Sequence, residues 1–355
     1  MILNFNVHNI FKFKVIGTNK RFIKYIDREF SFFKTDKIKN PDLIIRIGKF
    51  KPNNKNCHII DHKYYIKKNY FYCKDSYKVV KWEVQISGIE DRKTIVDFNG
   101  NFFADSFLVR YIIEPIMRFK TNKKGYAWLH SSGTSDGKNA FLLTTCKGVG
   151  KTSSILYLVS KGGLYLSDDF TILSNKGKVY SYPTTIHFFN YNLKGCPFIK
   201  KKLSFKDRFM VKFYDLLFKI TLGYGSLPVD IKVENIFESG KTGKSYPLKS
   251  LILLTKKNTD KIKIQKSNRE TIVKQIIPIN IIEAFNFYDY MLAYSFIFPN
   301  SDIANHWNKL EKNLLNGLKR VKCYQVDIPE NYNPNISKKI ESLLKRNGYL
   351  IKDLT

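Results

Sequence analysis

A chain of 355 residues has room for two domains, and its 43% hydrophobic and 26% charged residues exclude an intrinsically disordered protein. Its 61 Lys and Arg residues against 30 Asp and Glu give a formal net charge of +31, a charge typical of nucleic-acid or other polyanion binders. These basic residues are spread along the whole chain, so we favour a diffuse solvated surface as their explanation. The five cysteines stand at irregular spacing, which argues against a disulfide framework.

Neither a leader nor a membrane span stands out in the sequence. Residues 1–14 interleave polar and apolar side chains, unlike a cleavable signal peptide. The longest apolar runs, such as residues 290–299, are too short to cross a bilayer. We therefore expect a soluble cytoplasmic protein with no membrane partner, and we leave open whether it forms a homo-oligomer.

The first hundred residues are rich in short β patterns separated by polar turns. Strands are predicted within residues 42–50, 62–75, 78–87 and 93–100, where β-branched and aromatic residues gather. Residues 101–120 then show apolar positions at helical spacing, which predicts a helix that ends or kinks near Pro115. The sequence thus predicts a β-rich N-terminal domain over residues 1–122 with a closing helix.

From residue 126 the pattern changes to alternating strands and helices. The stretches YAWLHSS and AFLLTT are predicted strands, the glycine loop CKGVGK follows, and TSSILYLVSK is a predicted helix that stops at Gly162 and Gly163. The next predicted strand, LYLS, completes a βαβ unit. We assign residues 123–355 to a second domain, in which 249–257 and 323–329 are further predicted strands.

The glycine loop carries most of a phosphate-binding motif, G-x-x-x-x-G-K-[ST]. Gly150, Lys151 and Thr152 match its end and Gly148 is present, but Thr145 occupies the place of the usual first glycine. Glycine backbone and the positive end of the following helix suit phosphate oxygens, a lysine reaches the β and γ phosphates, and a threonine hydroxyl ligates Mg²⁺. The sequence therefore predicts ATP and Mg²⁺ as cofactors. The predicted nucleotide-binding residues are Thr145, Cys146, Lys147, Gly148, Val149, Gly150, Lys151 and Thr152.

A second stretch, SGKTGKS at residues 239–245, contains two matches to GK[ST]. Neither match has a glycine at the required upstream place, and no strand precedes them. We interpret this stretch as a basic loop without a nucleotide role.

Two adjacent aspartates, Asp168 and Asp169, follow the strand LYLS. If this strand runs parallel to AFLLTT, both strands end at the same edge of the sheet, and the aspartates arrive beside Lys151 and Thr152. Neighbouring side chains in an extended segment point to opposite sides, so only one carboxylate faces the transferred phosphate directly. The other is expected to hold metal-bound water or cap the loop.

Residues 129–183 resemble the catalytic core of HPr kinase/phosphorylase, a family related in fold to phosphoenolpyruvate carboxykinase. In that family a histidine lies twenty-one residues before the loop lysine, where His130 stands, and two aspartates lie where Asp168 and Asp169 stand. The resemblance implies that Asp169 is the general base, that His130 lies near the transferred phosphate with Lys151, and that Thr152 binds the metal. Asp168 is the second candidate metal ligand.

The resemblance does not extend to the family's downstream signature. A glycine-rich stretch with a metal-binding glutamate is absent, and Lys194 stands near the place of that glutamate. The chain is thus not a close match to HPr kinase itself, and HPr is not carried over as the substrate. The fold class that we predict is α/β, α+β overall, with a β-rich N-terminal domain packed on an HPr-kinase-like P-loop core with a mixed sheet.

The leading hypothesis is an ATP- and Mg-dependent kinase that transfers a phosphoryl group to a hydroxyl of an unidentified protein or small molecule. The alternatives are a nucleotide-gated ATPase or switch, an RNA-directed enzyme, and a degenerate core kept as an interaction module. Nucleic acid is not favoured as a partner, although the tyrosines and lysines of residues 62–78 resemble a stacking surface. Cys57, His58, His62 and Cys73 match no standard zinc spacing, and we predict no metal site there.

Overall fold

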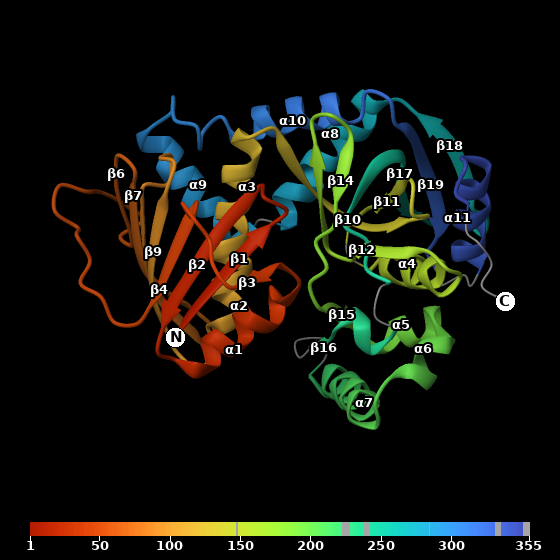
Figure 1. Ribbon diagram of the computed structural model, residues 1–355, viewed down its shortest axis with the longest axis horizontal. Helices are drawn as coiled ribbons and strands as arrows, with labels where there is room; N and C mark the ends of the chain where they lie inside the picture. The colour runs from red at the N-terminus through yellow and green to blue at the C-terminus, as the bar shows by residue number, and fades with distance from the viewer. Residues whose placement is uncertain (147, 222–227, 238–240, 284, 331–334, 351–355) are drawn as a thin grey trace. The chain divides into compact units, whose positions relative to one another are not determined.

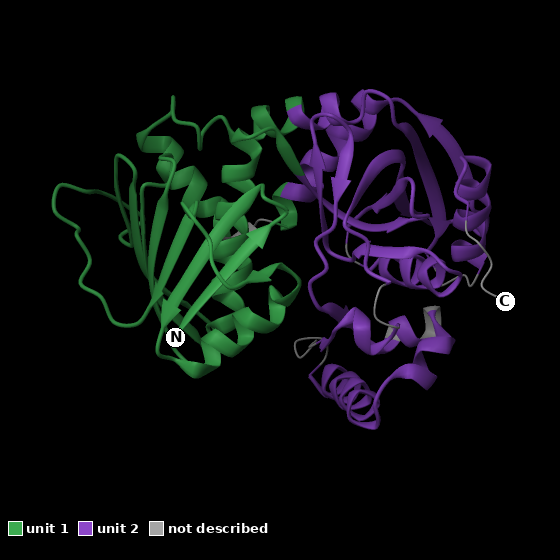
Figure 2. Cartoon of the chain, in the orientation of Figure 1, with its two compact units in different colours: residues 1–127, 281–312 green, residues 128–280, 313–355 purple. Residues whose placement is uncertain are grey.

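The computed structural model describes residues 1–355 except 147, 222–227, 238–240, 284, 331–334 and 351–355 (Figure 1). The chain divides into two compact units (Figure 2), one of residues 1–127 with 281–312 and one of residues 128–280 with 313–355. Both units combine helices with a large sheet, so the predicted mixed α/β class is confirmed. Residues 281–312 lie in the first unit, although the sequence pattern assigns them to the second domain.

A sheet that contains parallel and antiparallel pairs dominates the first unit. Its strands are β1 (Ile2–Val7), β2 (Phe11–Gly17), β3 (Lys34–Thr35), β4 (Leu43–Ile47), β5 (His58–Ile60), β6 (Tyr64–Lys67), β7 (Tyr70–Tyr77), β8 (Val80–Ser87) and β9 (Thr94–Gly100). They are ordered β3-β1-β2-β4-β9-β8-β7-β6-β5, and β4 pairs in parallel with both β2 and β9. The four predicted strand regions are confirmed, and the region 62–75 divides into β6 and β7 at a turn where Asn69 has a φ of 59°.

The first unit also contains helices. They are α1 (Lys20–Glu29), α2 (Asp105–Leu108), α3 (Glu114–Lys123), α9 (Phe285–Ile297) and the start of α10 (His306–Gly317). Of these helices, α1 and α3 contact β2, and α9 contacts β6. The predicted helix does not end at Pro115, because helical backbone continues to Lys123, but a π-helical turn over Val109–Ile113 joins α2 to α3 directly before Pro115. A proline lacks the N–H that would continue the regular α-helical bonding across this point.

Helix α1 is not predicted from the sequence, although its start carries a clear capping residue. The side chain of Asn19 accepts hydrogen bonds from the backbone N–H groups of Arg21 and Phe22. Phe22 and Ile26 are buried on one side of the helix. Lys20, Arg21 and Lys24 are exposed on the other side, so the segment is amphipathic.

The second unit is built on a sheet whose strands are β10 (Tyr126–Ser135), β11 (Ala140–Thr144), β12 (Leu164–Ser167), β13 (Phe170–Ser174), β14 (Lys178–Tyr180), β17 (Ser245–Lys257), β18 (Lys263–Ser267) and β19 (Lys322–Pro329). The order is β11-β10-β13-β14-β17-β19-β18, with β12 beside β10 and a further pairing of β11 with β17. The predicted strands 249–257 and 323–329 are therefore confirmed as β17 and β19, which pair in parallel.

The helices of the second unit are α4 (Lys151–Ser160), α5 (Asn190–Gly195), α6 (Pro197–Lys202), α7 (Phe205–Ile220), α8 (Arg269–Glu283) and α11 (Asn335–Arg346). The ribbon of β15 (Ile186–Phe188) and β16 (Val229–Ile231) belongs to the same part of the chain as α5–α7. Ile155 and Leu158 of α4 share one hydrophobic core with Ile199 and Val211 of α6 and α7. Helices α6 and α7 are thereby packed into the same core as α4.

The directions of β11 and β12 determine the position of Asp168 and Asp169 in the second unit. β11 and β12 both pair antiparallel with β10, so they run in the same direction with β10 between them. Their C-terminal ends therefore lie at the same edge of the sheet, where β11 leads into the glycine loop and β12 leads into Asp168. The predicted common edge is confirmed, although the two strands are not direct neighbours.

We predict that Asn19→Ala destabilises the first unit by about 1 kcal/mol, because two backbone donors at the start of α1 lose their acceptor. Urea unfolding of the whole chain measures this loss. Asn19→Asp keeps a capping oxygen and serves as the control. Equal stability of the Ala and Asp variants would contradict the capping role of Asn19.

Candidate functional site

The glycine loop lies between β11 and α4, with Lys147 outside the described residues. Gly148 and Gly150 have φ angles of 76° and 97°, in the left-handed region that side chains strain to adopt. A Cβ atom at either glycine would meet nothing within 4 Å, so backbone conformation rather than space requires glycine there. The loop thus leaves an open backbone cradle at the N-terminus of α4, an arrangement that suits phosphate groups.

Thr145 occupies the place of the glycine that phosphate loops usually carry first. Its side chain is buried, and it is not among the described non-glycine residues with positive φ. Its backbone oxygen accepts a hydrogen bond of 2.7 Å from Nζ of Lys151. This backbone therefore does not require glycine at position 145, and the threonine keeps the lysine in place.

Lys151 is buried, with 7% of its surface exposed, and its ammonium group also lies 2.5 Å from Nε2 of His130. An ammonium group can only donate, so Nε2 must accept and the ring proton of a neutral His130 stands on Nδ1. That Nδ1 atom lies 3.3 Å from Oδ1 of Asp169. Lys151, His130 and Asp169 therefore form one chain of polar contacts.

The position of His130 on β10 is fixed by Asn280 of α8. The Asn280 side chain accepts from the backbone N–H of His130 at 3.0 Å and donates to the backbone oxygen of Trp128 at 2.7 Å. Thr144 of β11 donates to the backbone oxygen of His130 at 2.9 Å. We did not identify Asn280 from the sequence, where its only signal is one polar residue within an apolar helical run.

Asp168 takes different partners from Asp169. Its carboxylate accepts hydrogen bonds of 3.0 Å from the hydroxyls of Thr152 and Ser132. Burial raises the pKa of the Asp168 carboxyl above its ordinary value, and the charge of Asp169 adds to this rise. The hydrogen bonds from Thr152 and Ser132 and the charge of Lys151 oppose the rise without cancelling it. Ser132 was likewise not identified from the sequence.

The two aspartates lie in the bend between β12 and β13, and their side chains diverge. Asp168 contacts Thr152, and Asp169 contacts His130 with 31% of its side chain exposed. Of the remaining predicted loop residues, Cys146 is exposed and Val149 is buried. The structure thus brings together the aspartates, His130 and the end of the loop.

The other sequence signals do not assemble a second site. Within the described residues, no group of three or more His, Cys, Asp and Glu side chains is arranged to hold a metal ion, and Cys73 is buried in β7. Residues 239 and 240 of the second GK[ST] stretch and the side chain of Lys194 lie outside the described part. Residues 241–243 of that stretch run beside β12, where the backbone of Tyr165 bonds to Lys241 and Gly243.

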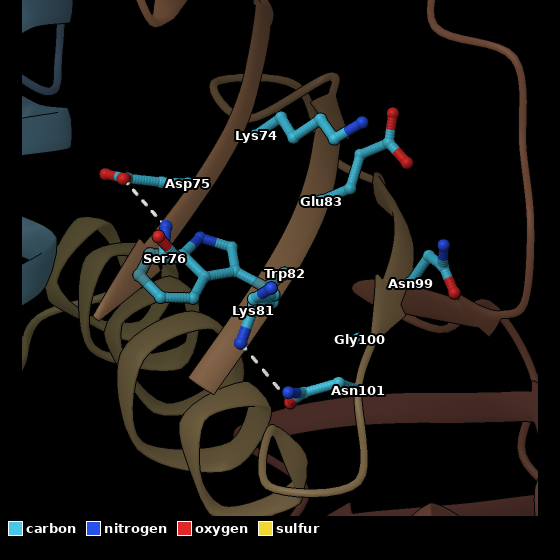
Figure 3. A pocket seen from close by; sticks show the side chains of 9 residues that line it. All are labelled: Lys74, Asp75, Ser76, Lys81, Trp82, Glu83, Asn99, Gly100 and Asn101. Atoms are coloured by element: carbon cyan, nitrogen blue, oxygen red, sulfur yellow. Dashed lines mark hydrogen bonds between the residues drawn. The ribbon is translucent and has the colours of Figure 1, made fainter. Parts of the chain in front are cut away.

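The tyrosine-rich strands of the first unit do not offer a continuous stacking surface. The rings of Tyr64, Tyr70, Phe71 and Tyr72 are all buried. The same strands border a pocket of about 670 Å³, where Lys74, Glu83 and Asn99 project from β7, β8 and β9 (Figure 3). None of the predicted site residues lines this pocket.

Comparison with known proteins gives little beyond this geometry. No family model matches the sequence, and no curated protein matches it. Among solved structures, the chain is similar to the Hpr(Ser) kinase/phosphatase from Coxiella burnetii, with 11% sequence identity and a TM-score of 0.30. That match covers 62% of this chain and 95% of the other chain. A likeness this distant assigns no activity.

In the described part of the chain, no helix combines the length and apolarity that a membrane span needs.

We predict that the stability difference between Asp168→Asn and the wild type depends on pH. Because the folded state raises the pKa of Asp168, the folded chain holds a proton that the unfolded chain has already released. Wild-type stability is therefore lost as pH rises from the ordinary aspartate pKa, about 3.9, through the raised value. The variant has no such loss, so its advantage in unfolding free energy grows from acid to neutral pH.

Thermal unfolding of both proteins across this pH range measures the difference. Asp260→Asn, at an exposed aspartate of the same unit, is the matched control. A constant difference between Asp168→Asn and the wild type at all pH values would contradict the raised pKa.

Proposed function

We propose that the second unit is a phosphotransferase that binds ATP with Mg²⁺ and transfers the terminal phosphoryl group to an acceptor hydroxyl. The observation that carries this proposal is the contact between the glycine-loop helix and the paired aspartates. Lys151 reaches Asp169 through His130, and Thr152 bonds directly to Asp168. A phosphate-binding element and two carboxylates therefore meet at one edge of the sheet, which is the arrangement that phosphoryl transfer requires.

The nucleotide phosphates fit the open backbone around Gly148 and Gly150. The positive end of α4 and the ammonium group of Lys151 both favour negative charge there. Burial of Lys151 excludes water from its charge and strengthens its attraction for phosphate oxygens. Thr145 and His130 hold the ammonium group near the loop before the nucleotide binds.

The donor set also fits a magnesium ion. Thr152 and Asp168 supply a hydroxyl and a carboxylate oxygen 3.0 Å apart, the ligand types that Mg²⁺ takes alongside waters and phosphates. When bound, Mg²⁺ neutralises charge on the phosphates. A nearby cation would also favour the ionised form of Asp168, whose pKa is raised by burial. Ser132 orients this carboxylate by its own hydrogen bond.

Asp169 is the general base in this proposal. Its carboxylate is partly exposed, so an acceptor hydroxyl has access to it, and His130 holds it from the buried side. Asp169 takes the proton from the acceptor hydroxyl as the oxygen attacks the terminal phosphorus, and the bond from that phosphorus to the bridging oxygen breaks to release ADP. Lys151 stabilises the negative charge on the moving phosphoryl group. The acceptor, a protein side chain or a small molecule, stays open.

We predict that Lys151→Ala lowers phosphoryl transfer by about 10²-fold or more and weakens ATP binding, because a preorganised positive charge is lost. Labelled ATP added to cell extract, separated into protein, RNA and metabolite fractions, measures transfer. Lys138→Ala, at an exposed lysine of the same unit, is the control. Normal phosphoryl transfer by Lys151→Ala would show that the glycine loop is not the ATP-binding element.

Asp169→Asn should leave ATP binding nearly unchanged and reduce transfer by about 10²-fold or more, the size expected for a positioned general base. Asp168→Asn should reduce transfer less and raise the Mg²⁺ concentration that transfer requires. The reverse order of the two effects would assign the base to Asp168. Release of free phosphate without any labelled acceptor would instead favour a nucleotide-gated ATPase, and label in the RNA fraction would favour an RNA-directed enzyme.

A further inference from the structure

Helix α7 exposes a continuous apolar stripe. The stripe consists of large side chains that are 79%, 59%, 42%, 54% and 68% exposed, namely Phe205, Phe209, Phe213, Leu216 and Ile220. Steps of four, four, three and four residues place all five on one side of an α-helix. An isolated exposed apolar residue is ordinary, but five on one helix face form a surface that marks an interaction.

The opposite side of α7 attaches the helix to its unit. Val211 is the buried residue that the described part of α7 contributes, and it belongs to the core that also contains Ile155 and Leu158 of α4. At 100° per residue, Val211 lies about 200° from the centre of the stripe. The stripe therefore points away from the core, although Phe218, which is 43% exposed, lies on the opposite side near the end of α7.

Positive charges flank the stripe. Lys206 lies beside it on one side, and Lys212 and Lys219 lie beside it on the other, as the helical repeat requires. All three lysines are exposed, and the preceding helix α6 ends in the exposed lysines 200–202.

Two acidic residues also lie on α7. Asp207 accepts a hydrogen bond from Ser204, which caps the helix, and Asp215 pairs with Lys219 at 3.1 Å. The surface of α6 and α7 is thus apolar along its centre and positive at its edges.

Shape and charge together indicate what such a surface binds. The phenylalanine rings protrude from a convex helix, whereas a helical or extended peptide is usually held in a concave groove. A lipid bilayer is broad and deformable, so protruding rings enter it while long lysine side chains reach its headgroups. Anionic headgroups also complement the flanking cations.

We propose that α6 and α7 bind the surface of an anionic lipid bilayer, with the apolar stripe inserted among the lipid headgroups and the lysines paired with lipid phosphates. This differs from the expectation of no membrane partner, which rested on the absence of a run long enough to span a bilayer. A helix that lies in the interface needs no such run. The proposal is also independent of phosphoryl transfer, because it involves none of the candidate active-site residues.

Flotation of the full chain with lipid vesicles tests the apolar stripe. We expect binding to vesicles of phosphatidylcholine mixed with phosphatidylglycerol and much weaker binding to phosphatidylcholine alone. Phe209→Ser and Phe213→Ser should each reduce vesicle binding roughly tenfold, because each variant lacks a phenyl ring that the lipid would bury. Phe296→Ser, at a phenylalanine of α9 that is 77% exposed, is the matched control and should bind as the wild type does.

The lysines are tested separately. Lys206→Gln and Lys212→Gln should each reduce binding to the anionic vesicles by about fivefold, and added salt should weaken binding of the wild type. Lys319→Gln and Lys322→Gln, at exposed lysines elsewhere in the second unit, control for total charge. An equal loss in these controls would show attraction of the whole basic surface and would overturn a dedicated site on α6 and α7.

Three other results would also overturn the proposal. They are equal binding to neutral and anionic vesicles, no binding to either, and unchanged binding of the phenylalanine variants. Size measurement by light scattering over a range of protein concentrations completes the test. Self-association that Phe209→Ser abolishes, without vesicle binding, would assign the stripe to a second copy of this chain.

Discussion

The buried ammonium group of Lys151 is the constraint around which the candidate site is arranged. A buried charge without partners costs several kcal/mol, so the fold must surround it with acceptors. Thr145 and His130 supply them, and His130 in turn contacts Asp169. The backbone of His130 is tied to α8 by Asn280. The position of one lysine thus depends on β10, β11, α4 and α8 together.

The two aspartates differ because their surroundings differ. Asp168 accepts from two hydroxyls, and burial raises its pKa, whereas Asp169 is partly exposed and faces an imidazole N–H. Adjacent carboxylates in different environments can take different roles, one beside a metal ion and one beside a reacting hydroxyl. The bend between β12 and β13 directs the two carboxylates to these different partners.

Much of the second unit's centre could be predicted from the sequence, because its signals are local. Glycines, a helix stop and paired aspartates at fixed spacing specify the loop, α4 and the end of β12. Ser132 and Asn280 could not be predicted, because their roles depend on strands and helices far apart in the chain. The place of residues 281–312 in the first unit could not be predicted either, because it depends on contacts between residues far apart in the chain. Tyr290 packs on Phe71 and accepts a hydrogen bond from Trp82. The stripe on α7 looks like a core face in the sequence, and only the fold shows that it is exposed.

We propose above all that the open loop before α4 binds the phosphates of ATP together with Mg²⁺. Calorimetric titration of the purified wild-type chain with ATP tests it most directly, first with Mg²⁺ and then with the metal chelated. We expect saturable binding of one nucleotide per chain, with a dissociation constant in the range of roughly 1 μM to 1 mM that is usual for enzyme substrates, and clearly weaker binding without Mg²⁺. The absence of saturable binding in the presence of Mg²⁺ would contradict the claim.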